Sequence, residues 1–117
     1  MGEVAIQTKS SLIKGTTTAA YVEALRVDTR GCGVQGKTVI QITNKSEDQT
    51  MYYKIDGYLA DPTGALGGTA IAKKAETSIA AATTVVNTDV AQVYAAVVVS
   101  VVNNSAACAY QIEYCTY

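Results

Sequence analysis

Few residues of this chain could carry chemistry. Histidine is absent, so the chain can build no imidazole base, no histidine-liganded zinc and no histidine-activated serine or cysteine nucleophile. Two carboxylates stand out, Asp56 inside an expected strand and Asp61 before the only proline. Asp56 is expected on the solvent face of its strand, and Asp61 with Thr63 matches no calcium-loop spacing. The sequence therefore predicts no enzyme, no metal site and no cofactor.

The three cysteines, Cys32, Cys108 and Cys115, form no CxxC pair. Cys108 and Cys115 fall in one expected strand at an odd separation, so their side chains point to opposite faces. At about 3.3 Å per residue they lie roughly 23 Å apart, too far to bond each other. Either could meet Cys32 in its glycine turn, but buried free thiols are the simpler interpretation.

The densest valine run, VYAAVVVSVV over residues 93–102, indicates the fold class. It is too short for a membrane span, which needs about 20 apolar residues, and its β-branched side chains favour a strand over a helix. Alternation places one set of side chains on one face and another set on the other: Val97, Val99 and Val101 against Tyr94, Val98 and Val102. We expect the first set in the core and the second covered, at least in part, within the domain or by a partner.

Further strand signals recur at short intervals and are separated by turn-forming residues. They fall at 3–8, 21–28, 38–43, 51–58, 83–88, 92–102 and 107–117. Alternation gives three of them a shared apolar face: Ile40 and Ile42 in 38–43, Met51, Tyr53 and Ile55 in 51–58, and Cys108, Tyr110, Ile112 and Tyr114 in 107–117. Residues 69–82 fit a helix or a strand, and we favour strand and loop because everything around them is β. Polar turns at 44–49 and 103–105 predict two hairpins between the strands that flank them. The pattern predicts an all-β fold, a single antiparallel β-sandwich over residues 1–117, jelly-roll or immunoglobulin-like, with about seven to eight strands.

Length, charge and the first residues limit the class of function. The 117 residues, 49% of them hydrophobic, suffice for one domain with its own core. Nine basic and ten acidic residues are dispersed along the chain, so nucleic acid is not an expected partner. The first residues lack the pattern of a secretory signal, and no apolar stretch is long enough for a membrane, so we expect neither export nor membrane insertion.

Eight tyrosines supply all the aromatic rings of the chain. A ring with a polar hydroxyl suits half-wet contacts between proteins. The N-terminal segment, residues 1–15, holds more apolar side chains than a free tail should expose. It is either the first strand of the sandwich or an assembly arm. The side chains expected to form an assembly surface are Val4, Ile6, Leu12, Ile13, Tyr94, Tyr110, Tyr114 and Tyr117.

Three segments within residues 39–114 carry a resemblance to a known class of proteins: VIQITNKSEDQTMYYKIDGYLADPTG, AETSIAAATT and VYAAVVVSVVNNSAACAYQIEY. They resemble the small β-sandwich structural proteins encoded among the virion genes of tailed bacteriophages, of the capsid decoration or head type. The resemblance implies a virion protein, made in the host cytoplasm, that binds and stabilises a preformed shell. Its partners would be the major capsid protein or another virion protein, and copies of itself.

Two other functions remain open. A self-assembling filament or pilus subunit would add its N-terminal strand to a neighbouring copy, although the missing export signal argues against it. A receptor-binding or carbohydrate-binding β module would use tyrosines as contact platforms, and the absence of tryptophan argues against that. In each case the protein acts through apolar, tyrosine and β-edge contacts.

Overall fold

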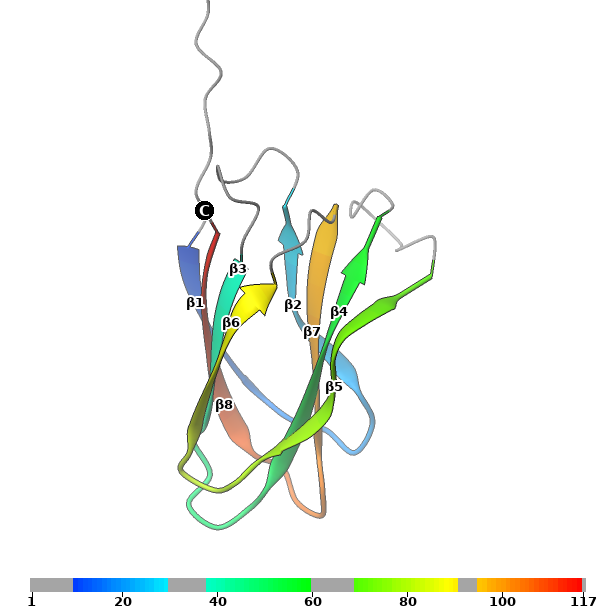
Figure 1. Ribbon diagram of the computed structural model, residues 1–117. Coiled ribbons are helices and arrows are strands. Elements are labelled where there is room, and N and C mark those ends of the chain that lie inside the picture. The colour runs from blue at the N-terminus through cyan, green and yellow to red at the C-terminus, as the bar shows by residue number, and fades with distance from the viewer. Residues whose placement is uncertain (1–9, 30–37, 60–68, 91–94, 117) are drawn as a thin grey trace, which may run out of the picture.

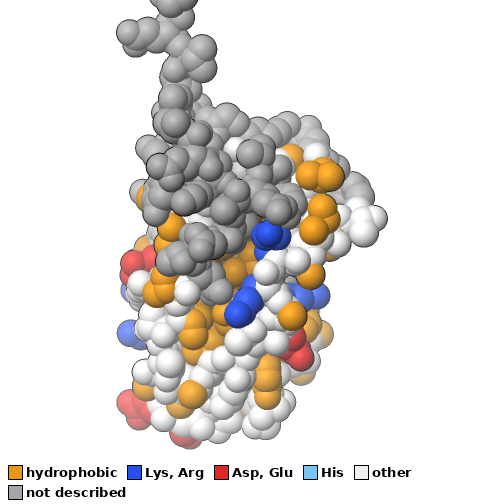
Figure 2. All heavy atoms as spheres, in the orientation of Figure 1, with side chains coloured by type: hydrophobic (Ala, Val, Ile, Leu, Met, Phe, Trp, Pro, Cys, Tyr) orange, Lys and Arg blue, Asp and Glu red, His pale blue; other side chains and the backbone are white. Residues whose placement is uncertain are grey.

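The computed structural model describes residues 10–29, 38–59, 69–90 and 95–116, and these form eight strands and no helix (Figure 1). The strands are β1 (Ser10–Thr16), β2 (Val22–Asp28), β3 (Thr38–Asn44), β4 (Met51–Tyr58), β5 (Ile71–Ile79), β6 (Thr84–Val90), β7 (Ala96–Asn103) and β8 (Ala109–Thr116). In the same view, charged side chains lie scattered over the described surface (Figure 2). The all-β prediction is confirmed.

The strand order is that of a jelly roll. The first sheet runs β1-β8-β3-β6 and the second runs β2-β7-β4-β5, and every pair is antiparallel. The first strand thus pairs with the last, the second with the seventh, and so on inward, which is the nested pairing of that fold. Of the two sandwich types expected from the sequence, the jelly roll is the one formed.

The two hairpins expected from the polar turns are not formed. β3 and β4 lie in different sheets, and so do β7 and β8. Residues 45–50 and 104–108 therefore carry the chain from one sheet to the other. Polar turn residues mark where a strand ends, but the buried faces decide which strand becomes its neighbour. The ambiguous segment 69–82 contains β5, so the strand interpretation is correct there.

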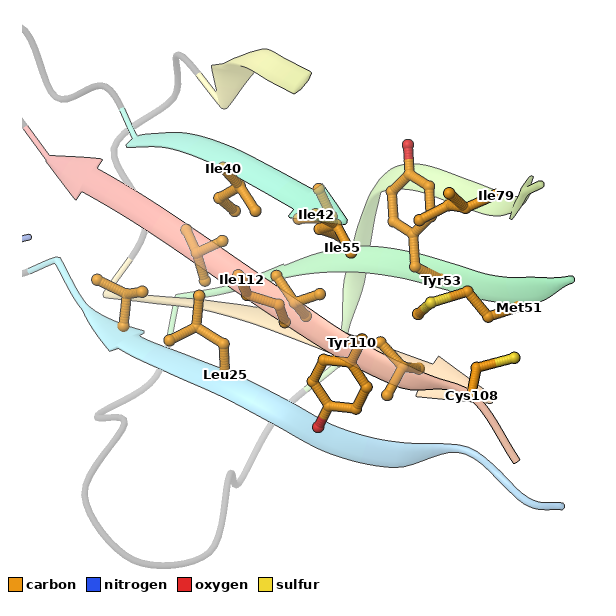
Figure 3. Close-up of a cluster of buried hydrophobic side chains, with 14 residues drawn as sticks. Leu25, Ile40, Ile42, Met51, Tyr53, Ile55, Ile79, Cys108, Tyr110 and Ile112 are labelled. Carbon is orange, nitrogen blue, oxygen red and sulfur yellow. The ribbon is translucent and has the colours of Figure 1, made fainter. Parts of the chain in front are cut away.

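Apolar side chains from alternate positions of the central strands fill the space between the sheets (Figure 3). β3 and β4 alternate strictly between buried and half-buried positions. The side chains in this core include Ile40, Ile42, Met51, Tyr53, Ile55, Tyr110 and Ile112. The inward faces expected from alternation in residues 38–43, 51–58 and 107–117 are confirmed.

β7 lies between β2 and β4 and is covered on both faces. Its inward valines, Val97, Val99 and Val101, are at most 1% exposed. On the outer face Val98 is 4% exposed and Val102 is 9% exposed. Both expectations for this strand hold where the structure describes it; Tyr94 lies outside the described residues. The apolar run therefore forms a central strand whose side chains are shielded from water on both faces.

Asn44 holds together the end of the molecule where β3, β5 and β6 meet. It is fully buried at the end of β3. Its Nδ2 donates to the carbonyl oxygens of Gln49 at 2.8 Å and Ile79 at 3.0 Å, and its Oδ1 accepts from the backbone N–H of Ser46 at 3.0 Å. One side chain therefore ties β3, the 45–50 connection and the end of β5 together.

A charge in the core should prevent folding. Val99→Asp places an unpaired carboxylate at a position that is 0% exposed, and such burial costs several kcal/mol, a large part of a domain's stability. We expect no cooperative thermal transition by circular dichroism. The control is Lys14→Asp, which puts the same carboxylate on an exposed strand position; a Val99→Asp protein as stable as this control would show that β7 is placed wrongly.

Removal of the Asn44 amide should destabilise the fold without abolishing it. Asn44→Ala leaves two carbonyls and one N–H without their partner, and we expect a loss of about 3 kcal/mol in the free energy of unfolding. Urea denaturation of this variant and of Asn104→Ala, at an exposed asparagine, measures the difference. Equal midpoints for the two variants would contradict the role given to Asn44.

Candidate assembly surface

The structure describes four of the eight residues expected at the assembly surface. Leu12 lies on β1 and is 50% exposed. Ile13 and Tyr114 are partly buried and pack against the core, and Tyr110 belongs to the core itself. Val4, Ile6, Tyr94 and Tyr117 lie outside the described residues. Among the four that are described, Leu12 is therefore the one whose side chain faces solvent.

Tyr110 lies close against the edge strand β1. Gly15 of β1 is its partner across the ladder. A Cβ added to Gly15 would lie 2.5 Å from the hydroxyl oxygen of Tyr110 and 2.6 Å from its Cζ. Burial raises the pKa of the Tyr110 hydroxyl. The ring fits because position 15 has no side chain, and it closes the sandwich beside β1.

The N-terminal segment is divided by this arrangement. Residues 10–15 belong to β1, which pairs with β8 along its length. Residues 1–9, including the first expected strand at 3–8, lie outside the described residues. The later part of the segment is thus a strand of the sandwich, while the assembly role expected for the earlier part stays a prediction.

The outer face of the first sheet carries exposed apolar side chains at both edges. The register places Leu12, Glu113, Gln41 and Val86 in one row across the four strands. Leu12 on β1 is 50% exposed and Val86 on β6 is 52% exposed. Exposed apolar side chains on edge strands are typical of surfaces that contact another protein. Val86 was not among the residues expected there, because its position on an edge strand follows from the topology.

The outer face of the second sheet is crossed by a tyrosine that sequence analysis missed. Tyr21, just before β2, donates a hydrogen bond from its hydroxyl to Oε1 of Glu76 on β5. The Nζ of Lys54 on β4 lies 4.6 Å from the centroid of the Tyr21 ring, within the range of a cation–π contact. β2 and β5 are the two edges of this sheet, so Tyr21 links one edge to the other.

The surroundings of Tyr21 favour its protonated form. Burial, the hydrogen bond to Glu76 and the negative charges of Glu76 and Asp56 all raise the pKa of its hydroxyl. The hydroxyl therefore remains a donor at neutral pH. Asp56 is half-buried on this outer face, and its role here is electrostatic.

The two described cysteines, Cys108 and Cys115, are both free thiols. Cys108 is buried in the core, whereas Cys115 is half-buried on the outer face of the first sheet, opposite Ser10 of β1 and Val39 of β3. Their expected placement on opposite faces is confirmed. A second molecule could reach Cys115 at this surface, but it could reach Cys108 only if the core opened. Cys32 lies outside the described residues.

Three further observations concern what the described surface offers. Within residues 10–29, 38–59, 69–90 and 95–116, no group of three or more Cys, Asp or Glu could hold a metal ion. No helix in that part of the chain is long and apolar enough to cross a membrane. The ion pair between Arg26 and Glu23, 2.8 Å apart, is partly exposed and contributes little to stability. What stands out on this surface is a set of strand edges, one exposed apolar side chain at each edge of the first sheet, one thiol and the Tyr21 link.

The Tyr21 link should contribute measurably to stability. Tyr21→Phe removes the hydrogen bond to Glu76, and we expect a loss of about 1 kcal/mol in the free energy of unfolding at pH 7. Because the pKa is raised in the folded state, this contribution is fully present below about pH 10 and is lost as the pH rises through the folded pKa. Tyr21→Phe should therefore lose less stability than the wild type between pH 7 and pH 11. Tyr58→Phe, which removes a hydroxyl from β4 without touching Glu76, is the control; an identical effect of both changes would argue against the link.

Comparison with known proteins places the fold. The sequence matches no protein-family model and no curated protein. Among solved structures, the chain is similar to a protein from work in which Bacillus endospore appendages form a novel family of disulfide-linked pili. The TM-score is 0.52 at 14% sequence identity, and the alignment covers 98% of this chain and 90% of that one. The two chains share the β-sandwich fold over nearly their whole length.

Proposed function

We propose that this protein is a self-assembling structural subunit that forms a filament from copies of itself. The observation that carries the proposal is the first sheet, whose two opposite edges each bear an exposed apolar side chain, Leu12 on β1 and Val86 on β6. Different surfaces at opposite edges favour a head-to-tail contact, and a head-to-tail contact that does not close produces a filament. The likeness to a pilus protein supports the same function.

The edges differ in how well they could accept another strand. β5 changes register against β4 twice, and β2 changes register once against β7. Such irregularities oppose pairing with a further strand. Residues 84–87 of β6 pair with β3 without a break, and the described side chains there, Thr84 to Val86, carry no charge. The first sheet therefore has a regular stretch at each of its edges, residues 10–16 of β1 and residues 84–87 of β6, that could pair with a neighbour.

A disulfide between copies would add a covalent link to the proposed filament. The pili of the similar protein are disulfide-linked, and Cys115 is the described thiol nearest the surface. A bond from Cys115 to Cys32 of a neighbouring copy would release two protons and two electrons to a thiol oxidant such as oxidised glutathione, and it could repeat from copy to copy because it uses two different thiols of each chain. Cys108 is fully buried and would take no part.

The virion role that the sequence resemblance implies stays a prediction. A decoration protein docks on a shell made by another protein, whereas the features above favour contacts between copies of one chain. The likeness to an appendage subunit also favours self-assembly. A receptor-binding or carbohydrate-binding role has less support, because Tyr110 and Tyr114 pack on the core and offer no open platform.

Electron microscopy of the purified chain tests the proposal. We expect open-ended filaments at high protein concentration, and a ladder of oligomers on a non-reducing denaturing gel after oxidation. Cys115→Ser should remove the ladder, and Cys108→Ser, the matched control, should keep it. A chain that stays monomeric at every concentration, or that associates only with a preformed shell, would overturn the filament proposal; a ladder that survives Cys115→Ser would overturn the assignment of the thiol alone.

A further inference from the structure

β5 and β6 meet at one end of the sandwich and separate toward the other (Figure 1). They are joined by the turn at residues 80–83, where Ala82 has a positive φ of 53° and its N–H donates to the carbonyl of Ser46 at 2.8 Å. Beyond the turn, β5 changes register against β4 between Tyr53 and Ile55 and again between Ile55 and Asp56. Such bulges bend a strand, so β5 leans away from β6.

The inward-facing surface where the two strands separate, which we call the β5–β6 wedge, comprises Ile71, Lys74, Val85 and the backbone of residues 84–87. Lys74 pairs with Ile55, a core residue, so its position faces the inside of the sandwich. Ile71 pairs with Gly57, which lies two positions after Ile55 on β4 and therefore on the same face of that strand. Ile71 is nevertheless 38% exposed and Lys74 is exposed, whereas Val85 is half-buried against the core. Figure 2 shows hydrophobic side chains beside lysine or arginine between these strands.

On the opposite side of the sandwich, between β1 and β2, Val22 pairs with the core residue Val101 and is 36% exposed. The Tyr110 ring packs against Gly15 there. Ile13 of β1 and Ala24 of β2 pack against the core. In the wedge, the exposed side chain of Ile71 at an inward-facing position leaves apolar surface that another segment could cover.

We propose that the wedge receives residues 3–8, EVAIQT, of a second copy of this chain, added as an extended strand beside β6. This inference rests on the filament function proposed above. Six extended residues span about 20 Å and place Val4 and Ile6 on one face, where they would cover Ile71 and Val85. Glu3 carries the charge opposite to that of Lys74, and the regular backbone of residues 84–87 offers the ladder.

The topology makes a second copy the fitting donor. β1 and β6 are the two opposite edges of the first sheet. Residues that precede β1 therefore enter the sheet three strand spacings from β6, about 14 Å away at roughly 4.8 Å per strand. A segment that leaves one edge and docks at the opposite edge of the next copy makes a heterologous contact. Repetition of that contact builds an open filament.

Substitutions in the wedge test the proposal on the full-length chain. Ile71→Ser and Lys74→Glu should each raise the concentration needed for assembly about tenfold, the second by placing like charges together. The charge-reversed double variant, Glu3→Lys with Lys74→Glu, should restore assembly. Val22→Ser is the matched control, because Val22 is 36% exposed and lies on β2, the edge of the second sheet opposite β5. Equal assembly of all four variants and the wild type would overturn the wedge as an acceptor while leaving the filament proposal intact.

Cross-linking between copies supplies a readout that does not depend on filaments. One chain carries Ile6→Cys and the other Ile71→Cys, both in a background with Cys32→Ser and Cys115→Ser, and the mixture is oxidised with oxidised glutathione. The expected product is a mixed dimer, formed at least tenfold faster than with Val22→Cys, on the opposite edge of the second sheet, in place of Ile71→Cys. Equal rates with the two acceptors, no dimer, or a bond formed only within a chain that carries both cysteines would each overturn the inference. Wild-type protein that forms no filament but gives the specific cross-link would instead contradict the filament function alone.

Discussion

Two open sheets in one sandwich leave four edge strands, and the backbone groups along an edge can pair with another chain. In this protein the four edge strands differ in their side-chain packing and in the regularity of their pairing. β1 carries Tyr110 packed over Gly15, and β2 is interrupted by a register shift. β5 is bent by two shifts. β6 keeps a regular ladder with β3 over residues 84–87 and an exposed valine. β6 thus keeps a regular stretch on the side where β5 separates from it (Figure 1).

The bend in β5 connects the stability of the fold to this opening. Asn44 fixes the end where β5 approaches β6, while the shifts against β4 direct the rest of β5 outward. Glu76, near those shifts, is held by Tyr21 from the far edge of the same sheet. The side chains that fix the position of β5 thus also fix the width of the wedge. A rigid acceptor loses less conformational entropy on binding than a flexible one, which favours assembly.

Much of the fold follows from alternation in the sequence. The apolar run in β7 and the alternating faces of β3, β4 and β8 predict strands, their inward residues and the two-layer class correctly. Sheet membership does not follow, because a polar turn such as residues 45–50 reads the same whether it joins neighbours in one sheet or crosses between sheets. The hairpin expectation was wrong for that reason. The β5 segment was ambiguous because an edge strand with bulges loses the strict period of two.

The surface could be predicted less well than the core. Leu12 was found because it is apolar in a short terminal segment, but the tyrosines were assigned to contacts by type, and Tyr110 and Tyr114 pack inward on the same face as Ile112. Val86 and Ile71 owe their exposure to edge positions that only the topology defines. The bond between Tyr21 and Glu76 joins residues 55 positions apart, and no local pattern in the sequence indicates it.

In the proposed filament, one surface of this jelly roll binds a different surface of the next copy, without closure. Sedimentation velocity of the full-length chain over a wide concentration range tests this most directly. An open head-to-tail contact predicts that the weight-average sedimentation coefficient continues to rise with concentration and reaches no plateau. A single species of constant size at all concentrations, or a plateau at a closed oligomer, would contradict it.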